Sequence, residues 1–219
     1  LRWLAWPLRL VIAVGAARVL LHNTTYLEDL AGPDSREWTP AQTWKILAGM
    51  GAALAVVWAA LVLLVRRAPG RSVPLAVALA CAAAAVTVMH SGYASGGQVG
   101  LPLAAALAGA VAASLVLSGP PAMEGALGLA VVGLFALLVI GRFFGELTTL
   151  NAALLFFAPL LCWLPELPPR FRGVARVVMV AVPVAVALLL AHQKFAEDSA
   201  RTAPGPQEPS TQDYLDIGK

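Results

Sequence analysis

Charged side chains are scarce in this sequence. Asp, Glu, Lys and Arg together make up 12% of the 219 residues, whereas hydrophobic residues make up 59%. An average soluble protein carries roughly a quarter charged residues, and a soluble fold could not cover so much apolar surface. The composition therefore excludes an ordinary soluble domain and predicts an integral membrane protein.

Cysteines and known reaction motifs are also few. Cys81 and Cys162 both fall inside apolar segments, so the sequence offers neither a disulfide framework nor the spacing of a zinc knuckle. It contains no HExxH motif, no Walker loop and no dinucleotide fingerprint, and it identifies no cofactor. Because arginines stand at the ends of apolar segments rather than in one patch, the formal charge of +3 indicates membrane topology and no nucleic-acid partner.

Long apolar runs divide residues 1–194 into predicted membrane spans. Each run is long enough, or nearly so, to cross about 30 Å of hydrocarbon as a helix. Only helices fit, because a lone strand could not satisfy its backbone hydrogen bonds in lipid. We therefore expect an all-α bundle of about seven transmembrane helices, near residues 3–21, 41–65, 73–91, 98–118, 124–141, 146–165 and 173–193.

The first of these runs has a second interpretation. The chain begins with Leu1 rather than Met, and its basic start and apolar middle also fit a processed signal peptide. A convincing cleavage site is lacking, because Arg18 interrupts the run and the sequence then continues apolar. We expect this segment to be retained as the first span.

The predicted orientation follows from the placement of Lys and Arg, which cytoplasmic loops favour. With the N-terminus inside, the short outer hairpin at 92–98 carries no charge and the C-terminus lies outside. The expected location is a bacterial cytoplasmic (inner) membrane. The inner side then receives Arg2, Arg9, Arg66, Arg67, Arg71, Arg170, Arg172 and Arg176.

Local signals mark helix ends and bends. Thr39, followed by Pro40 and Gln42, supplies an N-cap, a proline at the first helical position and a capping-box partner. The second span is therefore expected to begin there. Pro159 and Pro183 lie inside predicted spans and should kink them.

The composition changes after Lys194. Residues 195–219 are polar and rich in Pro, Gly and Ser, so we predict an extracytoplasmic tail that is disordered unless a partner binds it. Tyr214, Leu215 and Ile217 are its large apolar residues after Phe195. They are the residues expected to dock on a partner.

Small residues recur at four-residue spacing on two predicted spans. Such faces let helix backbones approach closely. They suit either packing within the chain or a contact with another membrane subunit. The two faces are Ala76, Ala80 and Ala84 on the third span, and Ala105, Gly109 and Ala113 on the fourth.

Two sets of polar residues fall at the predicted outer ends of helices. His22, His90 and His192 end the first, third and seventh spans, where imidazoles at one depth could bind a metal or relay protons. Arg142 and Glu146 are four residues apart and are expected to form a polar pair at the outer face.

One segment resembles a protease element. Ser95-Gly96-Gly97-Gln98-Val99-Gly100-Leu101 is similar to the Ser-Gly-x-x-x-Gly element of rhomboid intramembrane serine proteases. The resemblance implies that Ser95 is a nucleophile activated by a histidine on a later helix. His192, in Ala191-His192, would supply that base.

Three functions are compatible with these observations. The middles of the spans are nearly bare of polar residues, which favours a non-catalytic polytopic subunit or scaffold of a larger membrane complex, with the lipid bilayer and other membrane subunits as partners. A rhomboid-like protease is a minor alternative. The main alternative is a small-solute or ion transporter or channel with a polar outer-face site built from His22, His90, Arg142, Glu146 and His192.

Overall fold

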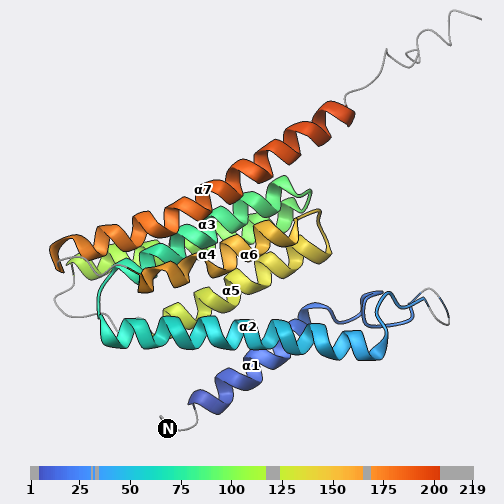
Figure 1. Cartoon of the computed structure of the whole chain (residues 1–219), viewed down its shortest axis with the longest axis horizontal. Helices are drawn as coiled ribbons and strands as arrows, with labels where there is room; N and C mark the ends of the chain where they lie inside the picture. The colour runs from blue at the N-terminus through green and yellow to red at the C-terminus, as the bar shows by residue number, and fades with distance from the viewer. Residues whose placement is uncertain (1–4, 31, 33–34, 117–123, 165–168, 203–219) are drawn as a thin grey trace, which may run out of the picture.

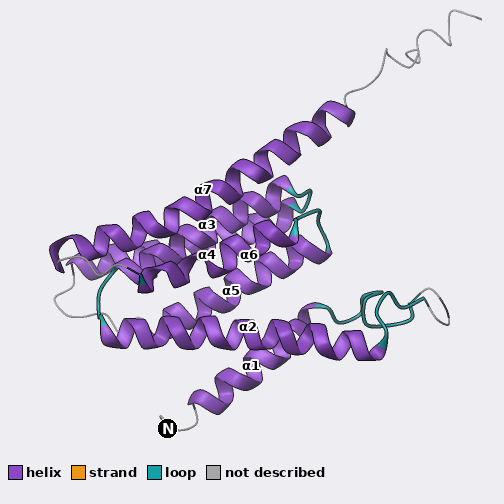
Figure 2. Cartoon of the chain, viewed as in Figure 1, coloured by secondary structure: helices purple, strands orange, loops and turns teal. Residues whose placement is uncertain are grey.

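The computed structural model describes residues 5–30, 32, 35–116, 124–164 and 169–202, and every regular element in these ranges is helical (Figures 1 and 2). This confirms the prediction of an all-α protein. In chain order the elements are α1 (Ala5–Leu20), α2 (Pro40–Arg67), α3 (Ser72–His90), α4 (Ala94–Val116), α5 (Glu124–Phe143), α6 (Thr149–Phe157), the 3₁₀ helix η1 (Ala158–Trp163) and α7 (Pro169–Thr202).

Five of the described helices are long and apolar enough to cross a membrane: α2, α3, α4, α5 and the Gly173–Arg201 part of α7. The other two predicted spans are shorter than expected. Helix α1 has 16 residues, or about 24 Å. Helix α6 has 9 residues and η1 has 6, and because a 3₁₀ helix rises about 2.0 Å per residue, the two together extend about 25 Å.

Helix α3 lies at the centre of the bundle. It packs against α4, α5, α6, η1 and α7. Helix α7 lies on one side of α3, and α5, α2 and α1 follow on the other (Figure 1). The small-residue face predicted on this helix is fully buried, since Ala76, Ala80 and Ala84 have no exposed surface. On α3, small residues therefore serve packing within the chain.

The two ends of the bundle differ in their side chains. We call the end at which α2 finishes and α3 begins the arginine end, and the end at which α3 finishes and α4 begins the histidine end (Figure 1). The arginine end holds Arg66, Arg67 and Arg71, and the histidine end holds His90 and His192.

Glu124 joins three helices at the arginine end. Arg66, at the end of α2, donates from Nε and Nη2 to the two Glu124 carboxylate oxygens at 2.9 and 2.7 Å. Arg9 of α1 places its Nη2 4.0 Å from the same carboxylate. Since Glu124 begins α5, this cluster fixes α1 and α2 to α5 at the arginine end.

The predicted helix signals have mixed outcomes. The capping box at Thr39 is present, with both reciprocal hydrogen bonds to Gln42, and α2 begins at Pro40 as predicted. The sixth predicted span changes from α-helix to 3₁₀ helix at Ala158, next to Pro159. Pro183 lies inside α7, and the helix does not end there.

The small-residue face predicted on α4 does not lie in the seam with α3. Ala105, Gly109 and Ala113 are exposed, and a Cβ added at Gly109 would meet no atom within 4 Å. The seam is formed by glycines nearer the start of α4. A Cβ at Gly97 would overlap the Met89 side chain and lie 2.7 Å from the carbonyl oxygen of Ala85.

Helix α7 also extends beyond its predicted end. It continues past Lys194 to Thr202, so residues 195–202 are helical rather than part of the predicted tail. The physical reason is that this stretch contains no Gly or Pro before Pro204 and includes the good helix formers Ala196, Ala200 and Arg201. The predicted docking residues Tyr214, Leu215 and Ile217 lie outside the described residues.

The two glycines of α4 give a matched test of the seam. Gly97→Ala should destabilise the protein by about 1–3 kcal/mol, because the added methyl group meets a backbone oxygen that cannot move alone. Gly109→Ala should be neutral or stabilise by about 0.5–1 kcal/mol through its helix propensity. The measurement is the free energy of unfolding in detergent, and equal effects of the two substitutions would contradict this packing.

Candidate functional site

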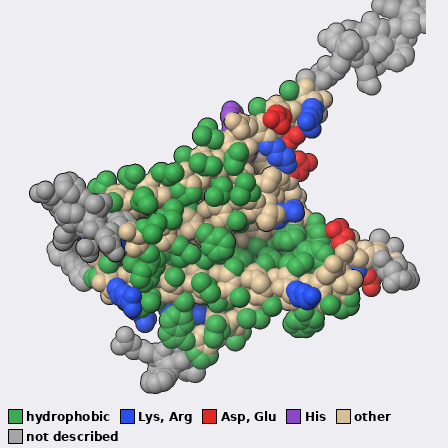
Figure 3. All heavy atoms as spheres, in the orientation of Figure 1, with side chains coloured by type: hydrophobic (Ala, Val, Ile, Leu, Met, Phe, Trp, Pro, Cys, Tyr) green, Lys and Arg blue, Asp and Glu red, His purple; other side chains and the backbone are tan. Residues whose placement is uncertain are grey.

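A groove opens sideways between α2 on one side and α5 and α6 on the other, toward the histidine end. Its volume is about 630 Å³, within the size range of small-molecule sites. Figure 3 shows this face of the molecule hollowed and lined with hydrophobic side chains. One wall consists of Ile46, Met50 and Ala53 of α2, and the other of Phe135, Leu138 and Val139 of α5 with Ala152, Ala153, Phe156 and Phe157 of α6.

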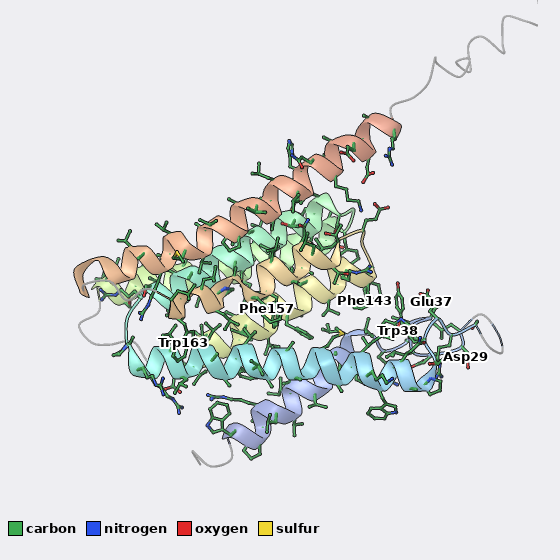
Figure 4. The ribbon with its side chains drawn as sticks, in the orientation of Figure 1. Asp29, Glu37, Trp38, Phe143, Phe157 and Trp163 are labelled. Carbon is green, nitrogen blue, oxygen red and sulfur yellow. The ribbon has the colours of Figure 1, made fainter. Side chains whose placement is uncertain are left out.

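Near the arginine end α2 is held closely to α5. There the ring of Trp58 lies directly over Gly128, where an added Cβ would approach the ring to 2.9 Å. The salt bridge from Arg66 to Glu124 reinforces this contact. Closer to the histidine end the facing residues are larger, and α2 stands away from Phe157 and Phe143 (Figure 4).

Three aromatic rings border the groove at the histidine end. Tyr26 and Trp38 come from the 21–39 connection, and Phe143 comes from the end of α5. The ring centroids of Tyr26 lie 5.0 Å from Trp38 and 5.1 Å from Phe143, and those of Trp38 and Phe143 are 5.5 Å apart. Such tilted and edge-to-face contacts are favourable, so the cluster ties the connection to α5.

Polar groups line the groove at this end only. Arg142 donates from Nε to Oγ1 of Thr149, the first residue of α6, at 2.9 Å. Glu37 accepts a hydrogen bond from the hydroxyl of Thr25 at 3.3 Å. All the other groove-lining residues named above, except Tyr26 and Trp38, are apolar. The groove therefore combines a charged mouth with a hydrocarbon-like interior.

Arg142 and Glu146 do not form the expected pair. Among the ion pairs of the described residues none involves Arg142, which contacts Thr149. Glu146 instead interacts with Lys194 of α7, whose Nζ donates to the Glu146 carbonyl at 2.7 Å and to Oε2 at 3.1 Å. Arg142 therefore contacts α6, whereas Glu146, which lies in the turn between α5 and α6, contacts α7.

The turn after α5 is anchored in a second way. The backbone N–H of Glu146 donates to the carbonyl of Ser91, which follows α3, at 2.9 Å. Lys194 and Ser91 thus hold one turn against both α7 and α3. The cavity beside these residues, next to the buried Asn151 side chain, measures only about 10 Å³ and is too small for a solute.

The structure brings two of the three predicted histidines together. The ring centroids of His90 and His192 lie 6.1 Å apart, and Phe195 stacks edge-on against His90 at 5.0 Å. His22 lies elsewhere, with its Nδ1 3.1 Å from Oε1 of Glu28. Within the described part of the chain, no group of three or more His, Cys, Asp or Glu side chains is placed to hold a metal ion.

Glu28 organises the start of the 21–39 connection. Its Oε1 accepts a hydrogen bond from the backbone N–H of Asn23 at 3.4 Å and lies 3.6 Å from Nη2 of Arg18. The hydrogen bond from Asn23 is the main influence that lowers the pKa of Glu28 below its ordinary value of 4.5, and the charges of His22 and Arg18 act in the same direction. This carboxylate therefore ties the end of α1 to the start of the connection that carries Tyr26.

The rhomboid-like segment has a packing role in the structure. Ser95 is exposed near the start of α4, and no hydrogen bond of the described residues joins it to His192. Gly97 and Gly100 pack against Ala85 of α3, where an added Cβ would lie 2.7 Å from an Ala85 atom in each case. Close helix contact accounts for these two glycines without a catalytic role.

Sequence reasoning did not find the groove. The residues of its α2 wall, Ile46, Met50 and Ala53, follow helical spacing, which would also suit ordinary packing or lipid contact. No protein-family profile, curated protein sequence or solved structure matches the chain.

The carboxylate of Glu28 should titrate below pH 4.5. Because its folded-state pKa is lowered, its stabilising contacts are fully present above 4.5 and are lost as the pH falls through the lower value. Carbon-13 NMR of labelled glutamate carboxyls would measure the midpoint, and Glu28→Gln would identify the signal. A midpoint at or above 4.5 would contradict the hydrogen bond from Asn23.

Proposed function

We propose that the chain is a non-catalytic subunit or scaffold of a larger membrane protein assembly. The observation that carries this proposal is the exposed face of α4, where Ala105, Gly109 and Ala113 recur at four-residue spacing. This helix contains no charged residue. Because the hydrophobic effect does not drive helix association in lipid, small side chains that permit close approach are what a partner helix requires.

The use of charged side chains gives a second reason. Arg66 and Glu124 bind each other, as do Lys194 and Glu146. Arg176, which is only 8% exposed, donates from Nε to the carbonyl of Cys162 at 3.1 Å. These groups hold helices and connections together instead of converging on one cavity, which suits a structural role better than catalysis.

The proposed architecture has seven helical passes. Arg9 of α1 reaches Glu124 at the arginine end, and the helix ends at Leu20, where the 21–39 connection begins. The α6–η1 segment extends from Thr149 to Trp163, whose ring lies 5.6 Å from the guanidinium carbon of Arg67 at the arginine end. Each short segment thus connects the two ends, and local thinning of the bilayer accommodates short helices.

The proposed orientation places the arginine end in the cytoplasm of a bacterium and the histidine end outside its inner membrane. The positive-inside rule is the reason, since Arg9, Arg66, Arg67, Arg71 and Arg176 all lie toward one end. Arg71 is anchored there by hydrogen bonds to the hydroxyl and the carbonyl of Ser114 in α4.

A small-solute or ion transporter is the second candidate because of one observation. His90, Ser91, Glu146 and Asp198 border a pocket of about 300 Å³ at the histidine end. Beneath this pocket, Thr87, Leu147 and Ala191 are buried. Transport would therefore require α3, α6 and α7 to move apart, whereas a subunit role needs no such movement.

Cysteine labelling tests the orientation. Ser95→Cys should react with a membrane-impermeant thiol reagent added outside cells, and Ser72→Cys should react only after the membrane is opened. The native Cys81 and Cys162 are fully buried, so background labelling should be low. The reverse pattern would overturn the proposed orientation.

Substitution on the exposed α4 face tests the subunit role. Gly109→Leu should leave the thermal stability of the isolated protein unchanged, since the added side chain meets open space, but it should displace a partner in complexes isolated with mild detergent. Gly49→Leu is the matched control, because Gly49 also lies inside an exposed part of a helix with no atom within 4 Å of an added Cβ.

The measurement is the native mass of the tagged protein isolated from its own membrane. A partner present in stoichiometric amount with the unaltered protein and with Gly49→Leu, but lost with Gly109→Leu, is the expected result. Isolation of the unaltered protein without any stoichiometric partner would contradict the subunit role.

A further inference from the structure

The groove between α2, α5 and α6 has the features of a lipid site. We propose that it binds a glycerophospholipid with an amine in its headgroup, taken from the leaflet at the histidine end. Arg142 binds the phosphate, Glu37 binds the amine, and the apolar walls hold one acyl chain. This inference requires only that the bundle crosses the membrane, and it is independent of any partner protein.

The depth of the groove fits a chain from one leaflet. Arg142 lies near the histidine end of α5, and Phe135 lines the groove seven residues earlier on the same helix. That separation is about 10 Å along the helix axis. Half of the hydrocarbon core is about 15 Å thick. A lipid with its headgroup at Arg142 would therefore place the upper part of one chain between the two walls.

Arg142 is positioned to bind a phosphate. Its Nε donates to Thr149, and no other hydrogen bond or ion pair of the described residues involves the side chain of this groove-lining residue, so the two terminal nitrogens are available to a ligand. A guanidinium binds phosphate oxygens through two parallel hydrogen bonds. The N-terminus of α6, which begins at Thr149 and is capped by Thr148, adds the favourable field of a helix dipole.

Glu37 determines which phospholipid headgroup is favoured at the charged end of the groove. Glu37 lines the same groove as Arg142, and no ion pair of the described residues includes it. A headgroup with only negative charge would meet repulsion from this carboxylate, whereas a primary ammonium beside the phosphate would complement it. The two opposite charges at the mouth therefore favour an aminophospholipid over an acidic one.

The aromatic cluster borders the headgroup end of the site. Tyr26 and Trp38 belong to the connection that Glu28 and its partners hold in place, and they pack against Phe143 beside Arg142. Amphipathic rings at the level of the headgroups are a feature of membrane interfaces. Here they border the end of an apolar groove that opens to the side, and an acyl chain would enter it from within the bilayer.

Native mass spectrometry of the full chain tests the proposal. The protein is reconstituted in nanodiscs of equal parts phosphatidylethanolamine, phosphatidylcholine and phosphatidylglycerol, released, and analysed for retained lipid. One retained phosphatidylethanolamine per chain is expected, with both other lipids retained less. Phosphatidylcholine is the matched lipid, since it has the same charges but its quaternary amine cannot donate a hydrogen bond.

Two pairs of variants assign the contacts. Arg142→Gln should lower retention about tenfold, the effect of losing one charged hydrogen-bonding contact. Arg201→Gln removes the same charge from an exposed position on α7 and should retain lipid normally. Glu37→Gln should reduce the preference for phosphatidylethanolamine over phosphatidylglycerol. Ala53→Phe, which fills the apolar part of the groove, should lower retention of all three lipids.

Each variant is first checked for an unchanged melting temperature in detergent. Ala53→Phe keeps the proposal testable if Arg142→Gln does not fold, because it changes the chain site without touching the charged mouth. Equal retention of the three lipids by the unaltered protein would overturn the proposal. Equal retention by Arg142→Gln and Arg201→Gln would also overturn it, since the retained lipid would then be bound elsewhere on the surface.

Discussion

The bundle depends on the small side chains of α3. In lipid, helices gain little from hiding apolar surface, so their association relies on close contact between backbones and on packing. Ala76, Ala80 and Ala84 are fully buried, and Ala85 meets the glycines at the start of α4. Because most of its residues have small side chains, α3 can contact helices on nearly every side. The positions of α4, α5 and α7 all follow from this helix.

Helix α2 packs closely on α5 along only part of its length, and the groove lies where this close packing ends. Trp58 lies against Gly128 near the arginine end, and Arg66 joins Glu124 beyond it. Toward the histidine end, Met50 of α2 and Phe156 of α6 line opposite walls of an open space. The groove therefore begins where the residues that face α2 are no longer glycine but larger side chains.

Most of the helices could be predicted from the sequence, because a hydrophobic run or a capping box is a local signal. The capping box at Thr39 is an example, and α2 begins where it predicts. Local sequence could not show which face of α4 packs on α3. Gly97 and Gly109 both lie on small-residue faces, and only the position of the neighbouring helix distinguishes them. Pairing of Arg142 with Glu146 failed for the same reason, because Thr149 and Lys194 approach from other helices. The groove depends on the distance between α2 and α6, which no spacing within either helix encodes.

The lateral opening of the groove has a consequence for how its occupancy is controlled. A molecule that enters from the side arrives by diffusion in two dimensions, so the relevant concentration is its mole fraction in one leaflet, not its concentration in water. By mass action, a ligand that contacts α2 and α6 together stabilises their arrangement more as its abundance rises, with a logarithmic dependence once the site is largely filled. The attachment of α2 to the bundle would then respond to the lipid composition of the membrane, and the protein would sense that composition through the separation of two of its own helices.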